Sequence, residues 1–180
     1  MNKFIQRLTK SLFLILFFVN FSFSQSENPY VAYKSKMIGQ LAPDFKFTDV
    51  LSGKEFFISD LKGKVVLLNM WFINCPGCKV EYPGLQNLKR RLTAQRKIEN
   101  VVLLSLALDS EDKLKDFFKK NPLDFYNMAN TDDICRGMYN VLGFPTNFIL
   151  DKNGIIRHIK IGGSAQSADD IEYEIIQLLK

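Results

Sequence analysis

Apolar runs and alternating segments along the chain predict β-strands. Val65–Phe72 and Val101–Leu106 are short, almost entirely apolar, and rich in β-branched or aromatic residues, which is typical of strands buried on both faces of a sheet. Ile155–Ile161 instead alternates between apolar and polar residues, as a strand with one exposed face does.

Other segments carry the spacing of helices. Leu85, Leu88 and Leu92 are separated by three and four residues, so they line one face of a helix that follows the first predicted strand. Similar patterns predict three more helices, at Ser110–Lys119, Asp132–Leu142 and Ala168–Leu179.

The last of these helices is expected to bury Ile171, Ile175 and Leu178, and Ser167 is available as its N-terminal cap. Strands that alternate with helices indicate an α/β domain. A chain of 180 residues suits one domain with a proper hydrophobic core better than two.

The amino end has the layout of a secretory signal peptide. A positive stretch, Lys3–Lys10, precedes the apolar run Leu12–Val19, which is short for a membrane span of about 20 residues. Ser22 and Ser24 permit cleavage before Gln25. We therefore expect a signal peptide over residues 1–24, with an uncleaved membrane anchor as the alternative, a polar linker over 25–38, and the folded domain over 39–180.

Composition and charge add no special partner. The chain has 47% hydrophobic and 24% charged residues, an ordinary globular balance. The net charge of +5 falls once Lys3, Arg7 and Lys10 are set aside, because 21 basic residues then face 19 acidic ones. No attraction to nucleic acid or to anionic lipid is expected from this balance, and the membrane is involved only through an uncleaved amino end.

The three cysteines exclude a scaffold of several disulfides, and two of them form the motif Cys75-Pro76-Gly77-Cys78. Such a pair is half of a zinc site, a redox centre, or chance. Zinc would need Cys135 and the single histidine, His158, as further ligands, and only composition supports them. We expect no metal and no cofactor.

The redox interpretation gains from the position of the pair, between a predicted buried strand and a predicted helix. Pro76 is tolerated well in the first turn of a helix. A sulfur at a helix amino terminus ionises more easily, and the thiolate is the form that attacks a disulfide. We therefore expect Cys75 to be the exposed nucleophile. Cys78 would be the less exposed resolving cysteine, one turn deeper.

Four motifs in order resemble the thioredoxin superfamily, and within it the TlpA/ResA-like branch of exported thiol-disulfide oxidoreductases. The motifs are Gly39–Phe45, Leu61–Asn69, Trp71–Pro83 and Gly143–Asp151. The resemblance implies an α/β, thioredoxin-like fold: a central mixed sheet flanked by helices, with the N-terminal extension typical of TlpA-like and AhpC/TSA-like domains.

The resemblance also assigns roles to residues. It makes Cys75 the attacking thiol, Cys78 the resolving thiol and Pro145 a cis-proline that faces the pair. An X-Pro bond is the type for which a cis peptide is permitted. Phe144 is then expected to lie beside a bound peptide. Other residues expected at the substrate contact surface are Trp71, Asn74 and Pro76.

Glu81 is the candidate acid–base residue. It follows Cys78 by three residues on the same side of the helix, and in the ResA-like branch a Glu at this position affects the titration of the cysteines. A partly buried carboxylate could accept the Cys78 proton; a solvated helix acid is the alternative. Asn69 stands where thioredoxin has a buried acid, and an amide cannot take a proton at working pH.

Two further positions depart from the family. Asn74 replaces a Trp that often precedes the first cysteine, which alters the contact surface. Cys135 has no partner in the family pattern, so we expect a small core residue, with a third redox role as the alternative.

The leading function is reduction of protein disulfides outside the plasma membrane, in the bacterial periplasm or cell envelope. A membrane thiol-disulfide electron donor would keep the protein reduced, and cytochrome c assembly is a role of some relatives. The residues support the chemistry and leave its direction open.

Two alternatives have other chemistry. A peroxiredoxin-like peroxidase is suggested by Ala42–Phe45, although Ile73 and Asn74 offer neither the Pro nor the Thr which that family places ahead of its cysteine. A copper or zinc carrier on the same fold is the other, although copper carriers use a spacing one residue longer.

Overall fold

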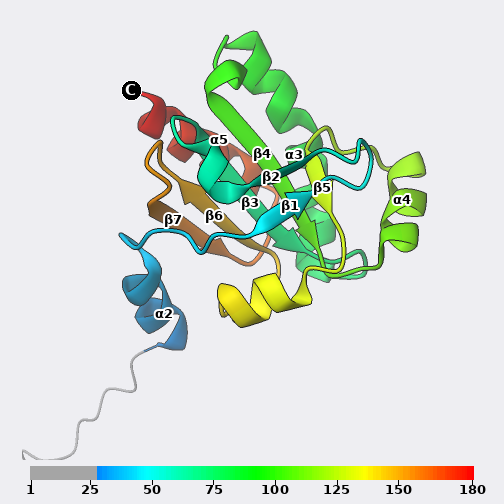
Figure 1. Cartoon of the computed structure of the whole chain (residues 1–180), viewed down its shortest axis with the longest axis horizontal. Helices are drawn as coiled ribbons and strands as arrows, with labels where there is room; N and C mark the ends of the chain where they lie inside the picture. The colour runs from blue at the N-terminus through cyan, green and yellow to red at the C-terminus, as the bar shows by residue number, and fades with distance from the viewer. Residues whose placement is uncertain (1–27) are drawn as a thin grey trace, which may run out of the picture. The chain divides into compact units, whose positions relative to one another are not determined.

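The structure, a computed structural model, describes residues 28–180 and is built on a five-stranded mixed sheet (Figure 1). Across the sheet, the strands lie in the order β5 (Tyr126–Met128), β4 (Val101–Ala107), β3 (Val65–Trp71), β6 (Thr146–Leu150) and β7 (Ile156–Ile161). The β3–β4 and β4–β5 pairs are parallel, and the β3–β6 and β6–β7 pairs are antiparallel. The predicted mixed α/β sheet is confirmed.

β3 is the central strand, and all seven of its residues are buried. Because successive side chains point to opposite faces, Val65, Leu67 and Trp71 join one hydrophobic cluster and Val66, Leu68 and Met70 join the other. Burial on both faces explains why this strand has an almost unbroken apolar sequence.

Different elements cover the two faces. The first cluster lies under three helices: α3 (Pro76–Ala94), α4 (Glu111–Lys120) and α5 (Ser167–Leu179). The second is closed by segments that include the antiparallel hairpin of β1 (Lys46–Thr48) and β2 (Glu55–Phe57), and two short helical turns, η1 (Ile58–Leu61) and η3 (Asp133–Met138). A further turn, η2 (Ile98–Asn100), precedes β4. The cysteine motif therefore starts a helix on the first face.

The helix α2 (Pro29–Met37) lies within the stretch expected to be a linker. It begins where the N–H of Tyr30 donates to the Asn28 side chain over 2.9 Å, and none of its residues is buried. A helix that buries no residue carries no apolar period, so the sequence pattern did not reveal it. The expected signal peptide, residues 1–24, lies outside the described residues.

Two predicted helices differ in detail. The helix expected over Asp132–Leu142 is wrong in length, because η3 spans only Asp133–Met138. Its turn is also wider than that of a regular helix, since the N–H of Tyr139 donates to the carbonyl of Ile134, five residues back. α5 has no side-chain cap. Ser167 instead lies inside the helix, and its hydroxyl accepts the N–H of Ser164 over 2.9 Å. Leu178 is only half-buried in α5.

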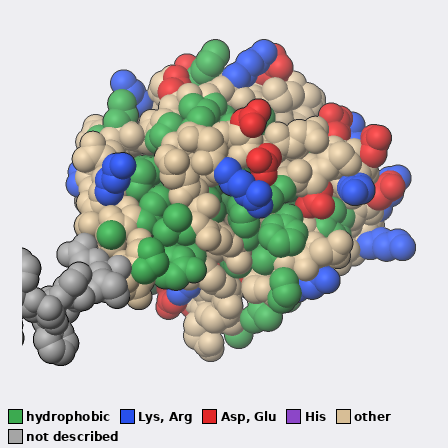
Figure 2. Space-filling view, turned by 90° about the horizontal axis from the view of Figure 1, so that it is seen from below, with side chains coloured by type: hydrophobic (Ala, Val, Ile, Leu, Met, Phe, Trp, Pro, Cys, Tyr) green, Lys and Arg blue, Asp and Glu red, His purple; other side chains and the backbone are tan. Residues whose placement is uncertain are grey.

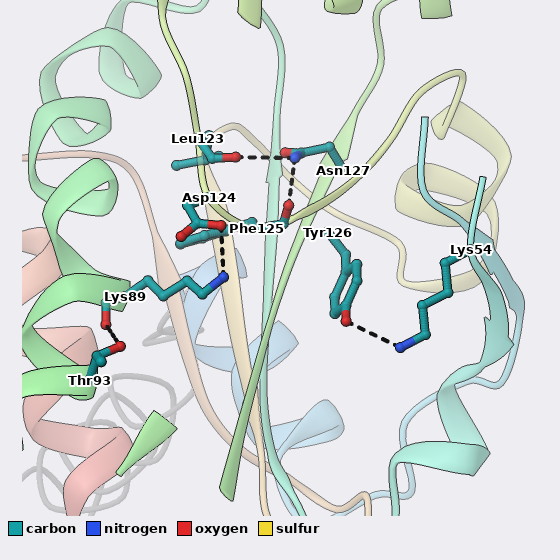
Figure 3. A network of polar contacts seen from close by, with 8 residues as sticks. All are labelled: Lys54, Lys89, Thr93, Leu123, Asp124, Phe125, Tyr126 and Asn127. Atoms are coloured by element: carbon teal, nitrogen blue, oxygen red, sulfur yellow. Dashed lines mark hydrogen bonds and ion pairs between the residues drawn. The ribbon is translucent and has the colours of Figure 1, made fainter. Parts of the chain in front are cut away.

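The edge strand β5 is anchored by its middle residue (Figure 3). Asn127 Nδ2 donates to the carbonyls of Leu123 and Phe125, over 3.3 and 2.7 Å. Its backbone N–H donates to Asp49 Oδ1 over 2.7 Å. Tyr126 beside it accepts a hydrogen bond from Lys54. In the parallel pairing of β5 with β4, Asn127 lies opposite Ser105.

Charges are mixed on the face shown in Figure 2, where hydrophobic patches lie between scattered acidic and basic groups. Within residues 28–180, no helix has both the length and the apolar character needed to cross a bilayer.

Candidate active site

Cys75 and Cys78 lie at the junction of β3 and α3 and are joined by a disulfide, with their Cα atoms 5.2 Å apart. Cys75 is the N-cap of α3 and Pro76 its first residue, as the sequence predicted. The backbone N–H of Cys78 donates to Cys75 Sγ over 3.1 Å. This N–H at the helix start has no partner within the helix, and it points instead at the sulfur of the predicted nucleophile.

The expected difference in exposure between the two cysteines is wrong. Cys75 is 2% exposed and Cys78 is 4% exposed, so both are buried in the disulfide form. The cause is the chain packed against the motif: Gly77 lies against the loop that holds Pro145 and against Gly163, which follows β7. Asn74 and Pro76 are the exposed members of the segment.

The peptide bond between Phe144 and Pro145 is cis, as predicted. Pro145 is buried, and a Cβ added to Gly77 would lie 3.2 Å from its Cδ. Phe144 is half-buried and meets Phe72 edge-on, with ring centroids 5.7 Å apart. The proline loop thus faces the cysteine pair, and two aromatic side chains lie beside it.

Gly163 is a member of the site that the sequence reasoning missed. A Cβ at this position would lie 2.1 Å from the carbonyl oxygen of Gly77, so only glycine fits against the motif there. The adjacent pair Gly162-Gly163, directly after a predicted strand, was the signal that could have marked this close approach of two backbones.

Trp71 lies beneath the site. It is 3% exposed, its Nε1–H donates to the Ser105 hydroxyl over 2.8 Å, and its ring packs on Tyr82 and Phe117. Trp71 therefore packs beneath the cysteine motif and not at the expected contact surface, whereas Phe144 lies at the edge of the motif.

Glu81 is buried between α3 and the sheet, and only 2% of it is exposed. Its Oε1 accepts Asn147 Nδ2 over 2.7 Å, and its Oε2 accepts Asn69 Nδ2 over 3.3 Å. Asn69 also donates to Asn147 Oδ1 over 2.8 Å. A solvated helix acid, the alternative considered for Glu81, is thus wrong.

This environment sets the proton affinity of the carboxyl. Burial raises the pKa of Glu81 to about 7, because the charged form loses its hydration. Hydrogen bonds from Asn147, Asn69 and Ser167 and the charge of Lys160 oppose that rise. Glu81 can therefore exchange a proton near neutral pH, three residues from Cys78 on the same helix.

Cys135 and His158 lie apart from the motif. Cys135 is a fully buried free thiol in the second cluster, as predicted for a core residue, and burial raises its pKa to about 11. His158 is on β7, 3.2 Å from Glu174. Across residues 28–180, no cluster of three or more His, Cys, Asp or Glu side chains is placed to hold a metal ion.

Comparison with known proteins identifies relatives of this chain. The AhpC/TSA family model matches residues 38–159. Thioredoxin-like protein YneN of Bacillus subtilis (strain 168) is 34% identical over 139 residues, 75% of this chain and 80% of the relative. Thiol-disulfide oxidoreductase ResA of Bacillus anthracis is 36% identical over 135 residues, 74% of this chain and 75% of the relative.

Solved structures agree on the fold. A thiol:disulfide interchange protein of the thioredoxin family from Chlorobium tepidum TLS superposes with a TM-score of 0.66 at 22% identity, covering 79% of this chain and 97% of that one. StoA from Bacillus subtilis gives 0.61 at 25% identity, covering 74% and 96%. The chain therefore belongs to the AhpC/TSA family, among the thioredoxin-like thiol-disulfide oxidoreductases.

Proposed function

We propose that the protein reduces disulfides of other proteins outside the plasma membrane by exchange at Cys75 and Cys78. The observation that carries this proposal is the hydrogen bond from the Cys78 N–H to Cys75 Sγ at the start of α3. In the reduced protein, this N–H and the positive end of the helix dipole would stabilise a Cys75 thiolate, the attacking form.

The proposed cycle begins when the Cys75 thiolate attacks one sulfur of a substrate disulfide. The substrate S–S bond breaks, and its other sulfur leaves as a thiolate that takes a proton from water. Glu81 accepts the proton of the Cys78 thiol, and the Cys78 thiolate attacks Cys75 Sγ in the mixed disulfide. The bond between Cys75 and the substrate sulfur breaks, and that sulfur leaves as a thiolate that takes up the proton released by Glu81. The substrate leaves with two reduced cysteines, and the protein is left as the disulfide.

Phe144 and Pro145 are proposed to receive the substrate. Phe144 is half-buried at the edge of the motif, so part of its ring is available to an extended peptide beside the cysteines. Asn74 and Pro76 are the exposed residues beside the cysteines and would complete the contact surface. The buried Trp71 would contribute indirectly, by supporting the cysteine motif.

The direction we propose, reduction, is supported by the surroundings of the pair. Both cysteines are buried, and an ionised Glu81 adds a negative charge nearby, so a thiolate there is less stabilised than the helix terminus alone would make it. A less stable thiolate favours the disulfide and gives a reducing couple. A membrane thiol-disulfide donor would then return two electrons, and cytochrome c assembly is one process that needs such reduced thiols.

Export is proposed from residues 1–24, with residues 25–38 as a connection and residues 39–180 as the redox domain. The positive stretch and apolar run of the amino end support a signal peptide or an uncleaved anchor. Either arrangement places the redox domain where disulfides persist.

Trapping of substrates tests this function. Full-length Cys78→Ser, produced in a bacterial host, should accumulate mixed disulfides between Cys75 and exported proteins, because the resolving thiol is missing. Covalent complexes are read by non-reducing electrophoresis and mass spectrometry. Cys135→Ser is the matched control and should trap nothing, because it keeps Cys78 to resolve the mixed disulfide and because Cys135 lies buried in the other cluster.

Two results would contradict the proposal. One is the absence of complexes on Cys78→Ser at expression levels where the wild-type protein is active. The other is a set of trapped proteins that never leave the cytoplasm.

A further inference from the structure

A row of polar side chains crosses the whole sheet at the level of Glu81. Each strand contributes one residue, and neighbours in the row are paired in register; the row is Asn127, Ser105, Asn69, Asn147 and Lys160. Paired residues share a face of the sheet, so the row lies beneath α3 and α5. Its last member, Lys160 on β7, carries a charge.

The Lys160 end of the row borders a cavity of about 430 Å³ beside β6, β7 and α5. Asn147 is only 1% exposed, yet it lines this cavity and donates to Glu81 on its other side. Lys160 lines the same cavity, opposite Asn147 on the neighbouring strand, and forms an ion pair with Asp170 of α5. A single amide thus separates the buried carboxyl from a cation at the cavity.

The groups that face Glu81 leave Lys160 as its counter-charge. α3 itself presents Cys78, which is held in the disulfide, and β3 and β6 present the neutral amides of Asn69 and Asn147. From α5 come the hydroxyl of Ser167 and, through its pair with Lys160, the carboxylate of Asp170. The charge of Lys160 favours the ionised form of Glu81.

We propose that Lys160 is a positioning residue of the redox site, whose charge acts across Asn147 to favour the ionised form of Glu81. Asp170 limits this effect because its carboxylate pairs with the same ammonium group. The inference rests on the proposed role of Glu81 as the proton acceptor. It assigns a part in the chemistry to Lys160 on the edge strand β7 and to Asp170 on α5, both of which line the cavity.

Direct titration of Glu81 tests the coupling without any redox step. The carboxyl carbon of Glu81 is followed by ¹³C NMR against pH in the oxidised full-length protein, with Glu81→Gln identifying the signal. Lys160→Met should move the titration midpoint upward, by on the order of one pH unit at most, and Asp170→Asn should move it downward.

Two matched controls separate charge from structure. Lys160→Arg keeps the cation and should keep the wild-type midpoint. Arg157→Met removes another cation that lines the same cavity but is paired with Asp151 over 2.7 Å, and should also leave the midpoint unchanged. Unchanged midpoints in both Lys160→Met and Asp170→Asn, or shifts of the same sign, would overturn the inference. If Lys160→Met does not fold, the downward shift in Asp170→Asn decides alone.

A second readout separates this inference from the proposed function. The rate at which Cys78 resolves a preformed mixed disulfide on Cys75 should follow the ionised fraction of Glu81, so Lys160→Met should slow it up to about tenfold below the midpoint. If the titration midpoint of Glu81 shifts and the rate of resolution by Cys78 does not change, the result supports the coupling and contradicts the role of Glu81. Rates that fall with an unshifted midpoint contradict the coupling.

Discussion

At the scale of single residues, Glu81 has the environment best suited to the proposed proton transfer. It combines near-complete burial with two amide donors and a raised proton affinity, and it lies three residues from the resolving cysteine. Because the amides of Asn69 and Asn147 cannot ionise at working pH, the proposed proton transfer would use the carboxyl of Glu81.

A stability measurement checks the state of this carboxyl. The folded pKa of about 7 lies above the ordinary value of 4.5, so the folded protein binds the proton more tightly than the unfolded chain does. The stability from this group is fully present below pH 4.5 and is lost as pH rises through about 7. The unfolding free energy of the oxidised wild-type protein should thus fall by up to about 3 kcal/mol relative to Glu81→Gln across this range.

Chemical denaturation at a series of pH values gives the unfolding free energy of each protein. Subtracting the pH dependence of Glu81→Gln from that of the wild-type protein removes the contribution of the other titrating groups. Parallel pH dependences for the wild-type protein and Glu81→Gln would contradict the raised pKa of Glu81.

At the scale of elements, the site is the meeting point of three backbone segments: the start of α3, the Phe144–Pro145 loop, and the turn after β7 that holds Gly163. Both cysteines are buried where these segments meet.

Gly163→Ala tests that contact. The new Cβ would overlap the carbonyl of Gly77, and backbone atoms cannot swing aside, so the turn must move away from the motif. We expect a loss of about 10- to 100-fold in the rate of protein disulfide reduction. Gly137→Ala in η3 is the control, since a Cβ there meets no atom within 4 Å. A Gly163→Ala protein with the wild-type rate would show that the close packing is dispensable.

The elements themselves could largely be predicted, for a physical reason. β3, α3 and α4 bury apolar faces, and burial leaves a period in the sequence. α2 buries no residue and was missed, and the wide turn of η3 cannot be distinguished from a regular helix by pattern alone.

At the scale of the whole molecule, the strand order decides which polar residues meet. Asn69, Asn147 and Lys160 are neighbours only because β6 and β7 follow β3 across the sheet. The cysteine pair and the cis-proline could be predicted, because each has a local motif or a family resemblance. The partners of Glu81 and the contact of Gly163 could not, because they depend on pairing between segments that are far apart in the sequence.

For the intact protein, we propose that the Cys75/Cys78 couple is a reductant. The most direct test is the reduction potential of this couple in the oxidised full-length protein, equilibrated with glutathione or dithiothreitol buffers at pH 7. We expect a value near that of thioredoxin, about −270 mV; a value near −120 mV, that of a strong oxidant, would contradict the proposed role as a reductant.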